Sequence, residues 1–260
     1  MTFDNLNYTI EDGVAIIELN RPDKLNSFDN SLAANLQIAL DDCMENREVR
    51  CVLLTGNGRG FCAGQDLSEA ISPDFGEISE HVEAKCNPVV RKIRAIEKPV
   101  IAAVNGVAAG AGANLAFCCD IIVAAESAKF IQSFINIGLI PDMGGTYFLP
   151  RLVGPHMAAA MMMLGEKMTS NEAKQIGLVY KVFEDDEFMA QAKQLAKRMA
   201  KMPTRGIGLT KKALNYSLQN NLNEQLEVEK VLQGEAGRTA DNAEGIAAFI
   251  EKRTPNFRGE

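Results

Sequence analysis

A single acidic residue, Asp142, lies in a segment built largely from apolar residues, glycine and proline, GLIPDMGGTYFLPRLVG (138–154). Apolar surroundings remove water from a carboxylate, which raises its pKa and makes it a stronger base. Asp142 is therefore a candidate for moving a proton. A structural alternative is open at this point, because aspartate is a favoured helix N-cap and a helix could begin at Met143.

Two glycine-containing segments carry groups that would complement such a base. GNGRGFCAGQDL (56–67) follows the apolar run CVLLT, and NGVAAGAGANL (105–115) follows the apolar run VIAAV. Glycine permits positive φ and close approach of a ligand, so turns of this kind can aim backbone N–H groups at an acceptor. A helix that begins within GAGANLAFCC would add further unpaired N–H groups. Two N–H groups that converge from these turns would form an oxyanion hole.

Other kinds of site match the sequence poorly. GVAAGAG lacks the G-x-G-x-x-G spacing of a dinucleotide-binding turn, and GNGRG is not followed by the Gly-Lys-Ser/Thr of a phosphate-binding loop. No G-x-S-x-G motif is present, and the sequence suggests no histidine partner for any cysteine. The two histidines and six cysteines lack metal-ligand spacing, so no bound metal is expected. The cysteines are expected to be reduced and buried, in a cytoplasmic protein.

The composition restricts the partners. The 260 residues are 47% hydrophobic and 23% charged, with a net charge of −7 and no lysine- or arginine-dense block. A nucleic acid or an anionic membrane would require such a basic patch, so neither is expected as a partner. The N-terminal sequence lacks a secretory pattern, and the apolar stretches are too short to span a membrane. The length suits one large domain, or one domain with a small appendage.

The hydrophobic patterns indicate an α/β protein. Two short β-rich runs, 8–10 and 14–19, are separated by Glu11-Asp12-Gly13 and predict a hairpin. Strands that alternate with helices farther along the chain favour a mostly parallel sheet. The expected strands are 49–56, 100–106 and 121–130, and the expected helices are 28–43 and 78–96.

The pattern changes after Gly154 and becomes mainly helical. Helical periodicity predicts helices at 186–202, 210–221, 223–234 and 242–253. We therefore divide the chain into a core at 1–195 and a helical region at 196–260. The methionine-rich run HMAAAMMMLG (156–165) fits a helix buried in the core, and it also fits a subunit interface.

Five segments, taken in order, resemble the enoyl-CoA hydratase/isomerase (crotonase) family. They are RPDKLNSF (21–28), GRGFCAGQDL (58–67), KPVIAAVNGVAAGAG (98–112), GLIPDMGGTYFLPRLVG (138–154) and FIEKRTPNF (249–257), which together span essentially the whole chain. The resemblance implies an α/β fold in which a crotonase-like spiral of ββα units precedes a C-terminal helical region that mediates trimerisation. It also implies a homotrimer or hexamer and an acyl-CoA substrate, with no cofactor other than the coenzyme A of the substrate.

The resemblance also assigns roles to individual residues. The family's two oxyanion donors correspond to the backbone N–H groups of Gln65 and Ala111. Phe249 and Lys252 correspond to positions that approach coenzyme A from a neighbouring subunit. Further contacts with coenzyme A are implied for Lys24, Leu25, Ala63, Gly64, Asp66 and Leu67.

Two departures from the family's hydratases bear on the reaction. Those enzymes carry two glutamates, at the positions that correspond to Asn114 and Phe134 here. Hydration needs one group to activate water and another to manage a proton at the α carbon, and neither residue can do either. Asp142 occupies a third position, where the family's dienoyl-CoA and ring-epoxide phenylacetyl-CoA isomerases carry aspartate. The sequence most resembles the latter group, which acts in phenylacetate breakdown.

The resemblance therefore implies an acyl-CoA isomerase in which Asp142 moves one proton while the oxyanion hole stabilises an enolate. Phe134, Ile140 and Met143 are expected to provide the apolar surroundings of Asp142. Residues 68–85 are expected to line the acyl pocket, and they carry no decisive signal for the acyl group.

Three alternatives stay open. A hydratase of broad specificity would have to activate water with Asp142 alone. A dehalogenase-like reaction would use Asp142 as a nucleophile, but relatives of that kind also need a histidine and a tryptophan. This chain has no tryptophan, and His81 lies in a segment that does not match. The third alternative is a non-catalytic binding member of the fold, since fold does not fix function. A complex with a hydratase of the same pathway is compatible with the resemblance.

Overall fold

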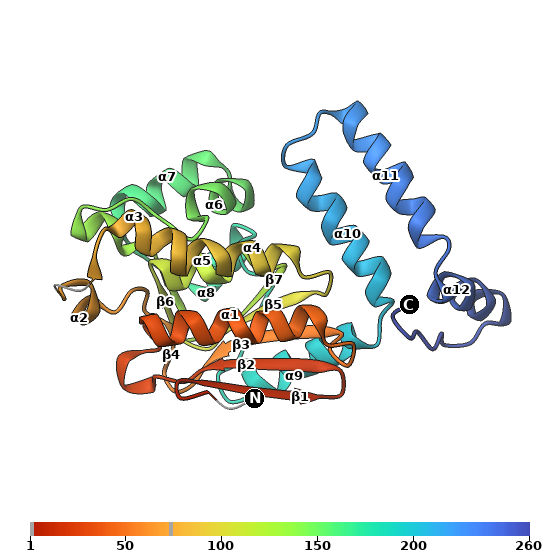
Figure 1. The fold of residues 1–260 in the computed structure, drawn as a ribbon, viewed down its shortest axis with the longest axis horizontal. Coiled ribbons are helices and arrows are strands. Elements are labelled where there is room, and N and C mark those ends of the chain that lie inside the picture. The colour runs from red at the N-terminus through yellow and green to blue at the C-terminus, as the bar shows by residue number, and fades with distance from the viewer. Residues whose placement is uncertain (1–2, 73–74) are drawn as a thin grey trace.

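The computed structural model describes residues 3–72 and 75–260. Figure 1 shows sheets surrounded by helices, with the last helices extending to one side. The larger sheet has six strands in the order β1-β2-β3-β5-β7-β10, and the smaller has four in the order β4-β6-β8-β9. The strands of the larger sheet are β1 (Leu6–Glu11), β2 (Val14–Leu19), β3 (Cys51–Gly56), β5 (Val100–Val104), β7 (Ile121–Ala125) and β10 (Lys181–Phe183).

Five of the six strands of the larger sheet match the predicted pattern, whereas β10 lies in the part expected to be mainly helical. β1 and β2 form the expected antiparallel hairpin, and both turn residues, Asp12 and Gly13, have positive φ (52° and 78°). The pairs β2–β3, β3–β5, β5–β7 and β7–β10 are all parallel. Every residue of β3 and β5 is buried, which explains why both strands are continuous apolar runs in the sequence.

The smaller sheet is not apparent from the sequence pattern. Each of its strands has three residues, too few to show a period, and β4 and β6 lie in the segments interpreted as glycine turns. The single strand expected at 121–130 is in fact β7 and β8. A strand of the larger sheet is repeatedly followed by one of the smaller sheet, which confirms the crotonase-like spiral. The strands are β4 (Gly60–Cys62), β6 (Val107–Ala109), β8 (Lys129–Ile131) and β9 (Lys167–Thr169).

The first predicted helix is α1 (Asn30–Glu45). It buries Leu32, Leu36 and Leu40, which repeat at helical spacing along one face. Its N-cap is Asp29, whose carboxylate accepts the Leu32 N–H at 2.7 Å. This bond satisfies one of the amides that the start of a helix leaves unpaired.

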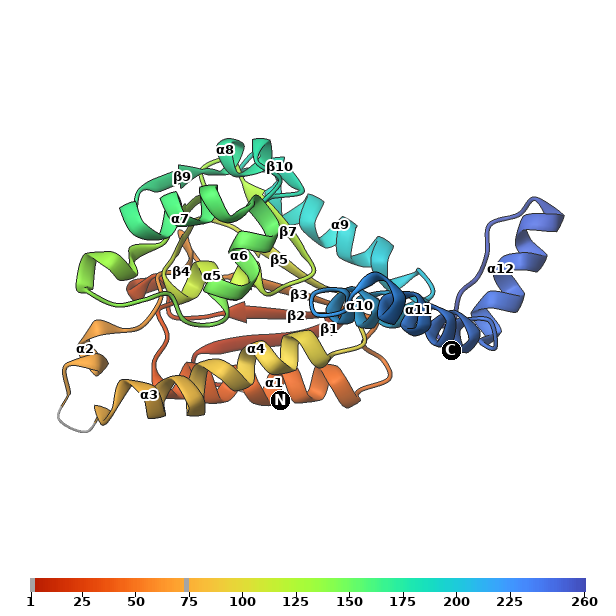
Figure 2. The same cartoon turned by 90° about the horizontal axis from the view of Figure 1, so that it is seen from above.

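The helix expected at 78–96 contains a wider turn. α3 (Ile78–His81) continues through a π-helical segment, η3 (Val82–Cys86), into α4 (Asn87–Ala95). Proline at position 88 explains the change, because it has no N–H to offer the carbonyl oxygen of Ala84. That oxygen accepts from Nε2 of Gln37 on α1 at 3.4 Å instead. α4 lies alongside α1 in both views (Figures 1 and 2).

Shorter helices connect the strands. The methionine-rich helix α7 is buried only in part: Ala158 and Met161 are inside, whereas Met163 is 72% and Leu164 62% exposed. The expectation of a helix buried in the core therefore holds for one face of α7. The short helices are η1 (Pro22–Lys24), α2 (Leu67–Ala70), α5 (Ala111–Phe117), η4 (Ser133–Ile137), α6 (Gly145–Val153), α7 (Pro155–Leu164) and α8 (Ser170–Gln175).

The C-terminal part contains the four predicted helices, α9 (Phe188–Ala200), α10 (Thr204–Ser217), α11 (Leu222–Ala236) and α12 (Ala240–Glu251). α9 contacts β2, β3, β5 and β7, whereas α11 and α12 extend away from the sheets (Figures 1 and 2). The expected boundary between 195 and 196 lies within α9, and it stays a prediction. Lys211 holds α10 to the core, because its Nζ lies 2.7 Å from Asp120 Oδ2.

Candidate active site

One cavity brings most of the predicted site residues together. It has a volume of about 290 Å³ and lies among the turn after β4, the start of α5, η4 and the helix that begins at Ile78. Six of the residues assigned by resemblance border it: Ala63, Gly64, Gln65, Leu67, Ala111 and Asp142.

Two backbone amides at this cavity are free to donate. Among the described residues, the N–H groups of Gln65 and Ala111 have no hydrogen-bond acceptor. The two turns approach closely because Gly64 has φ +91° and no side chain. A Cβ at Gly64 would lie 2.9 Å from the Ala109 carbonyl oxygen and 3.4 Å from the Ala111 nitrogen. A carbonyl oxygen held between two such amides would be stabilised as it gains negative charge.

Local structure leaves each of these amides unpaired. Phe28 N donates to Gly64 O at 2.7 Å, and Asp66 N donates to Phe28 O at 2.7 Å. Successive groups of an extended segment point to opposite sides, so the intervening Gln65 N–H points away from Phe28. Ala111 is the first residue of α5, where an N–H group has no partner within the helix.

Asp142 is not a helix cap. α6 begins at Gly145, its N-cap is Gly144, and no side chain caps its first turn. The Asp142 carboxylate borders the cavity, and its Oδ1 is buried without a hydrogen-bond partner in the described structure. Burial raises the pKa of this carboxyl group to about 6. The N-cap interpretation is wrong, and the carboxylate has the properties that a general base needs near neutral pH.

The residues at the two hydratase glutamate positions provide no second acid. Phe134 borders the cavity, whereas Asn114 is fully buried and lies outside the cavity lining. Along the ranges 3–72 and 75–260, Asp142 is the one carboxylate that borders the cavity.

The apolar surroundings of Asp142 differ in part from the expectation. Phe134 borders the cavity as predicted, and Met143 is buried with 1% of its surface exposed but does not border it. Ile140 is 81% exposed, so its assignment is wrong. Ile137 and Leu139 border the cavity instead. The segment has no regular period that would show which of its apolar side chains turn inward.

A histidine and its partners form another part of the cavity wall. Nε2 of His81 lies 3.0 Å from Oε1 of Gln65, and the ring stacks on Phe75 with 4.6 Å between centroids. Gln65 Nε2 donates to Glu69 at 3.2 Å, so its Oε1 must face His81, and Nε2 of His81 carries the hydrogen. Burial lowers the pKa of His81. The predicted pocket segment contributes Phe75, Ile78, His81 and Val82 to the lining.

The residues assigned to coenzyme A are spread over two regions. Leu25 lies beside the cavity, because Ala63 N donates to Leu25 O at 3.0 Å, and the neighbouring Lys24 is exposed. Phe249 and Lys252 lie on and directly after α12, on the opposite side of the molecule from α2 and α3 in Figure 1. Phe249 is 86% exposed, and the single chain does not bring it to the cavity.

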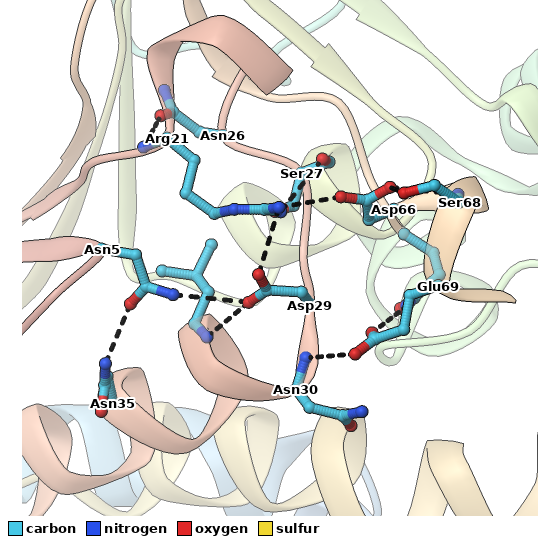
Figure 3. A network of polar contacts seen from close by, with 12 residues as sticks. Asn5, Arg21, Asn26, Ser27, Asp29, Asn30, Asn35, Asp66, Ser68 and Glu69 are labelled. Carbon is cyan, nitrogen blue, oxygen red and sulfur yellow. Dashed lines mark hydrogen bonds and ion pairs between the residues drawn. The ribbon is translucent and has the colours of Figure 1, made fainter. Parts of the chain in front are cut away.

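The Asp66 side chain has other partners. Its Oδ2 accepts from Arg21 at 2.9 Å, and its Oδ1 accepts from the Ser68 hydroxyl at 2.6 Å. Arg21 also contacts Asp29, so that one guanidinium joins the starts of α1 and α2 (Figure 3). Asp66 does not border the cavity, and its predicted contact with coenzyme A stays a prediction.

The described residues offer neither a metal site nor a membrane-spanning helix. Within the described ranges, no group of three or more histidine, cysteine, aspartate and glutamate residues is placed to hold a metal ion. In the same ranges, no helix is long and apolar enough to cross a membrane. The six cysteines are free and buried, as predicted.

Comparison with known proteins places this geometry in a family. The model of the enoyl-CoA hydratase/isomerase family matches residues 9–260. A 1,2-epoxyphenylacetyl-CoA isomerase of Escherichia coli (strain K12) is 46% identical, over 96% of this chain and 97% of that protein. A probable enoyl-CoA hydratase of Rhodobacter capsulatus is 40% identical over the full length of both. The crystal structure of a putative enoyl-CoA hydratase from Streptomyces coelicolor, 38% identical, superposes with a TM-score of 0.94 over 100% of this chain and 96% of that one. The chain belongs to the enoyl-CoA hydratase/isomerase family.

Proposed function

We propose that the protein is an acyl-CoA isomerase that transposes a carbon–carbon double bond, and that it converts a ring-epoxide phenylacetyl-CoA to an oxepin-CoA. The proposal rests on Asp142, the sole carboxylate bordering the cavity in the described residues, together with two free amides. One base is enough for isomerisation, because the proton that it removes can be returned at another carbon. The relative named 1,2-epoxyphenylacetyl-CoA isomerase, with 46% identity, supports the same reaction.

The first step forms an enolate. The thioester carbonyl oxygen accepts the N–H groups of Gln65 and Ala111, and ionised Asp142 takes a proton from the carbon next to the carbonyl. The electron pair of that C–H bond moves onto the carbonyl oxygen, where each amide contributes about 3 kcal/mol of stabilisation. Because the carboxylate has no partner on Oδ1, it does not have to break a hydrogen bond before it accepts the proton.

The second step returns the proton. Neutral Asp142 delivers it to a conjugated carbon, the carbonyl re-forms, and the double bond ends in a new position. With a ring epoxide, the carbon–carbon σ bond shared by the epoxide and the six-membered ring breaks. Its electron pair and the two π pairs of the ring diene become the three double bonds of a seven-membered oxepin, and the proton transfer then moves one of these double bonds into conjugation with the carbonyl. Atoms and electrons balance without water, an oxidant or a separate cofactor, and coenzyme A stays attached throughout.

A hydratase of broad specificity is the second candidate, because relatives with 40% and 38% identity are named hydratases. Hydration needs a second group that protonates the α carbon. His81 is the other titratable side chain bordering the described part of the cavity, and its Nε2 hydrogen already bonds Gln65. The hydratase candidate therefore lacks a free proton donor.

We further propose that the protein is cytoplasmic and assembles as a homotrimer or hexamer through its C-terminal helices. Large apolar side chains with 62–86% exposure support this assembly, because monomers rarely expose many such groups together. Phe249 and Lys252 would then reach coenzyme A bound to a neighbouring subunit. Light scattering that gives a monomer at micromolar concentration would contradict the assembly. The exposed side chains are Met163, Leu164, Leu222, Val231, Phe249 and Ile250.

A panel of substrates tests the reaction. Linear 3-enoyl-, 2-enoyl- and 3,5-dienoyl-CoA and ring-epoxide phenylacetyl-CoA would be followed spectroscopically, with water labelled by oxygen-18. We expect isomerisation of the ring epoxide without incorporation of the label. Hydration of 2-enoyl-CoA that is faster than every isomerisation would instead establish the hydratase.

A further inference from the structure

The residue at a hydratase glutamate position has a different partner here. Asn114 lies within α5, its side chain is fully buried, and it does not border the cavity. Its Nδ2 donates to the backbone carbonyl oxygen of Asp142 at 2.8 Å. Asn114 therefore contacts the peptide that carries the candidate base, and its side chain lies away from the substrate cavity.

A second buried side-chain amide, that of Gln132, is hydrogen-bonded to Asn114. Gln132 is 1% exposed, and its Nε2 donates to Asn114 Oδ1 at 2.9 Å. The Asp142 carbonyl oxygen sets the direction of both hydrogen bonds. It can only accept, so Asn114 must donate to it through Nδ2. Asn114 Oδ1 then faces Gln132, which must present Nε2 in turn. Gln132 Oε1 is left buried without a partner among the described residues.

The loop that these amides hold has an unusual backbone. Met143 has φ +46° and Gly144 has φ +74°, and a methionine seldom adopts the left-handed region. Gly145 N donates to the same Asp142 carbonyl oxygen at 2.8 Å. A Cβ on Gly145 would lie 2.3 Å from Asn114 Nδ2, so glycine at this position is what allows the Asn114 amide to reach the loop.

We propose that Asn114 and Gln132 are positioning residues, whose chain of two amides fixes the Asp142 peptide so that its carboxylate faces the cavity. An unpaired buried acceptor is unfavourable. Of the two linked amides, Gln132 carries this unpaired atom, Oε1, and Gln132 is the one farther from Asp142. The proposal rests on the proposed function in one respect, namely that Asp142 carries the proton.

The kinetics of Asn114→Ala, Gln132→Met and a control, Asn215→Ala, test this role. In Asn114→Ala the loop loses a donor, and we expect kcat to fall by about 10- to 100-fold, as small misplacements of catalytic groups do. KM should change by less than about twofold, because Asn114 does not border the cavity. Asn215→Ala is the matched control. Asn215 Oδ1 accepts from Nε of the Arg94 guanidinium, and its Nδ2 donates to the Arg94 backbone carbonyl oxygen, between α4 and α10 and away from the cavity, so kcat should be unchanged.

Gln132→Met covers the case in which Asn114→Ala does not fold. Methionine has a similar length, and the number of unpaired buried acceptors stays the same, because Asn114 Oδ1 replaces Gln132 Oε1. Tm should therefore stay within about 3 °C of wild type, while kcat falls by about tenfold because the Asn114 amide can rotate. Wild-type kcat in folded Gln132→Met and Asn114→Ala would overturn the proposal.

A measurement without turnover separates this proposal from the proposed function. Infrared difference spectra against Asp142→Asn report the titration of the Asp142 carboxyl group in each background. Release of the loop should hydrate the carboxylate, so its pKa in Asn114→Ala should move from about 6 toward the ordinary aspartate value. An unchanged titration would reject positioning. Full activity of Asp142→Asn would reject the proposed function and leave this test of the loop intact.

Discussion

Asp142 borders the cavity and Asp66 directly follows a residue that does, and their surroundings shift the pKa values of the two carboxyl groups in opposite directions. Asp66 directly follows the cavity residue Gln65 and is 7% exposed, with Arg21 and Ser68 as partners of its two oxygens. The bond from Ser68 and the contact with Arg21 lower the pKa of its carboxyl group. Asp142 has one oxygen buried without a partner, and burial raises its pKa to about 6.

The contrast separates a carboxylate with partners on both oxygens from one that has a buried oxygen without a partner in the described structure. Hydrogen bonds and a cation stabilise the charged form of Asp66, which anchors the turn after β4 (Figure 3). Arg21 spans Asp66 and Asp29, and thereby fixes the segment whose Gln65 amide faces the cavity. Among the described residues, Asp142 has no cation partner, and burial outweighs the one hydrogen bond from its own backbone, so its pKa is raised to about 6. We propose that one aspartate fixes the turn that carries the Gln65 amide and that the other moves the proton.

Substitution of the unpaired aspartate should have the largest effect. Asp142→Asn keeps the size of the side chain and removes the base, so kcat for isomerisation should fall by two to four orders of magnitude. Thermal stability should be unchanged or higher, because a desolvated carboxylate has been removed. Stopped assays with the ring-epoxide phenylacetyl-CoA would measure the rate. Turnover close to wild type in a folded variant would show that the base lies elsewhere.

Removal of one oxyanion donor should have the next largest effect. Ala111→Pro deletes a backbone N–H at the first position of α5, where proline fits the helix, and turnover should fall by about a hundredfold or more. Ala111→Gly is the control, because it keeps the N–H and should retain most of the activity. If Ala111→Pro folds and works as well as Ala111→Gly, the carbonyl oxygen does not bind between these amides.

Much of the fold can be predicted from the sequence, because its signals are long. β3 and β5 are continuous apolar runs, and Leu32, Leu36 and Leu40 repeat at helical spacing, so each pattern contains enough residues to reveal its period. The three-residue strands of the smaller sheet contain no such repeat. The π-helical turn depends on a carbonyl oxygen that loses its donor at Pro88, a local defect inside an otherwise regular pattern.

The site could be predicted only where local sequence determines the backbone. The glycine turns around Gly64 and Gly110 and the lone acid Asp142 are visible in the sequence, and the structure brings all three to one cavity. The pairing of Arg21 with Asp66 joins residues 45 positions apart, and His81 meets Gln65 across 16. No spacing rule connects such pairs, because the intervening fold decides which side chains meet.

Substitution of the paired aspartate should act mainly on stability. Asp66→Asn removes a charge-assisted bond to Arg21, whose side chain is 18% exposed, and the free energy of unfolding should fall by about 2 kcal/mol. The kcat should fall by less than about tenfold, since the variant leaves the Gln65 amide in place. Urea unfolding at fixed protein concentration, with the substrate assay on the same samples, would measure both quantities. A loss of activity as large as that of Asp142→Asn would mean that Asp66 also acts in turnover and that its role is more than structural.

The pH dependence of stability should differ in sign between the two sites, with the smallest effect. Folding raises the pKa of Asp142 from 3.8 to about 6, so the folded state binds this proton more tightly, and the Asp142 contribution is lost as pH rises from about 4 to about 6. Folding lowers the pKa of Asp66, so its contribution is present above about pH 4 and is lost as pH falls below that value. Relative to Asp142→Asn, the free energy of unfolding of the wild type should therefore fall by about 1–2 kcal/mol between pH 4 and pH 7. Partial hydration of the carboxylate keeps this change small. Relative to Asp66→Asn, wild type should lose its advantage only under acidic conditions. Urea titrations from pH 3 to pH 8 would trace both differences, and a parallel pH dependence of the two variants would mean that the aspartates share one environment.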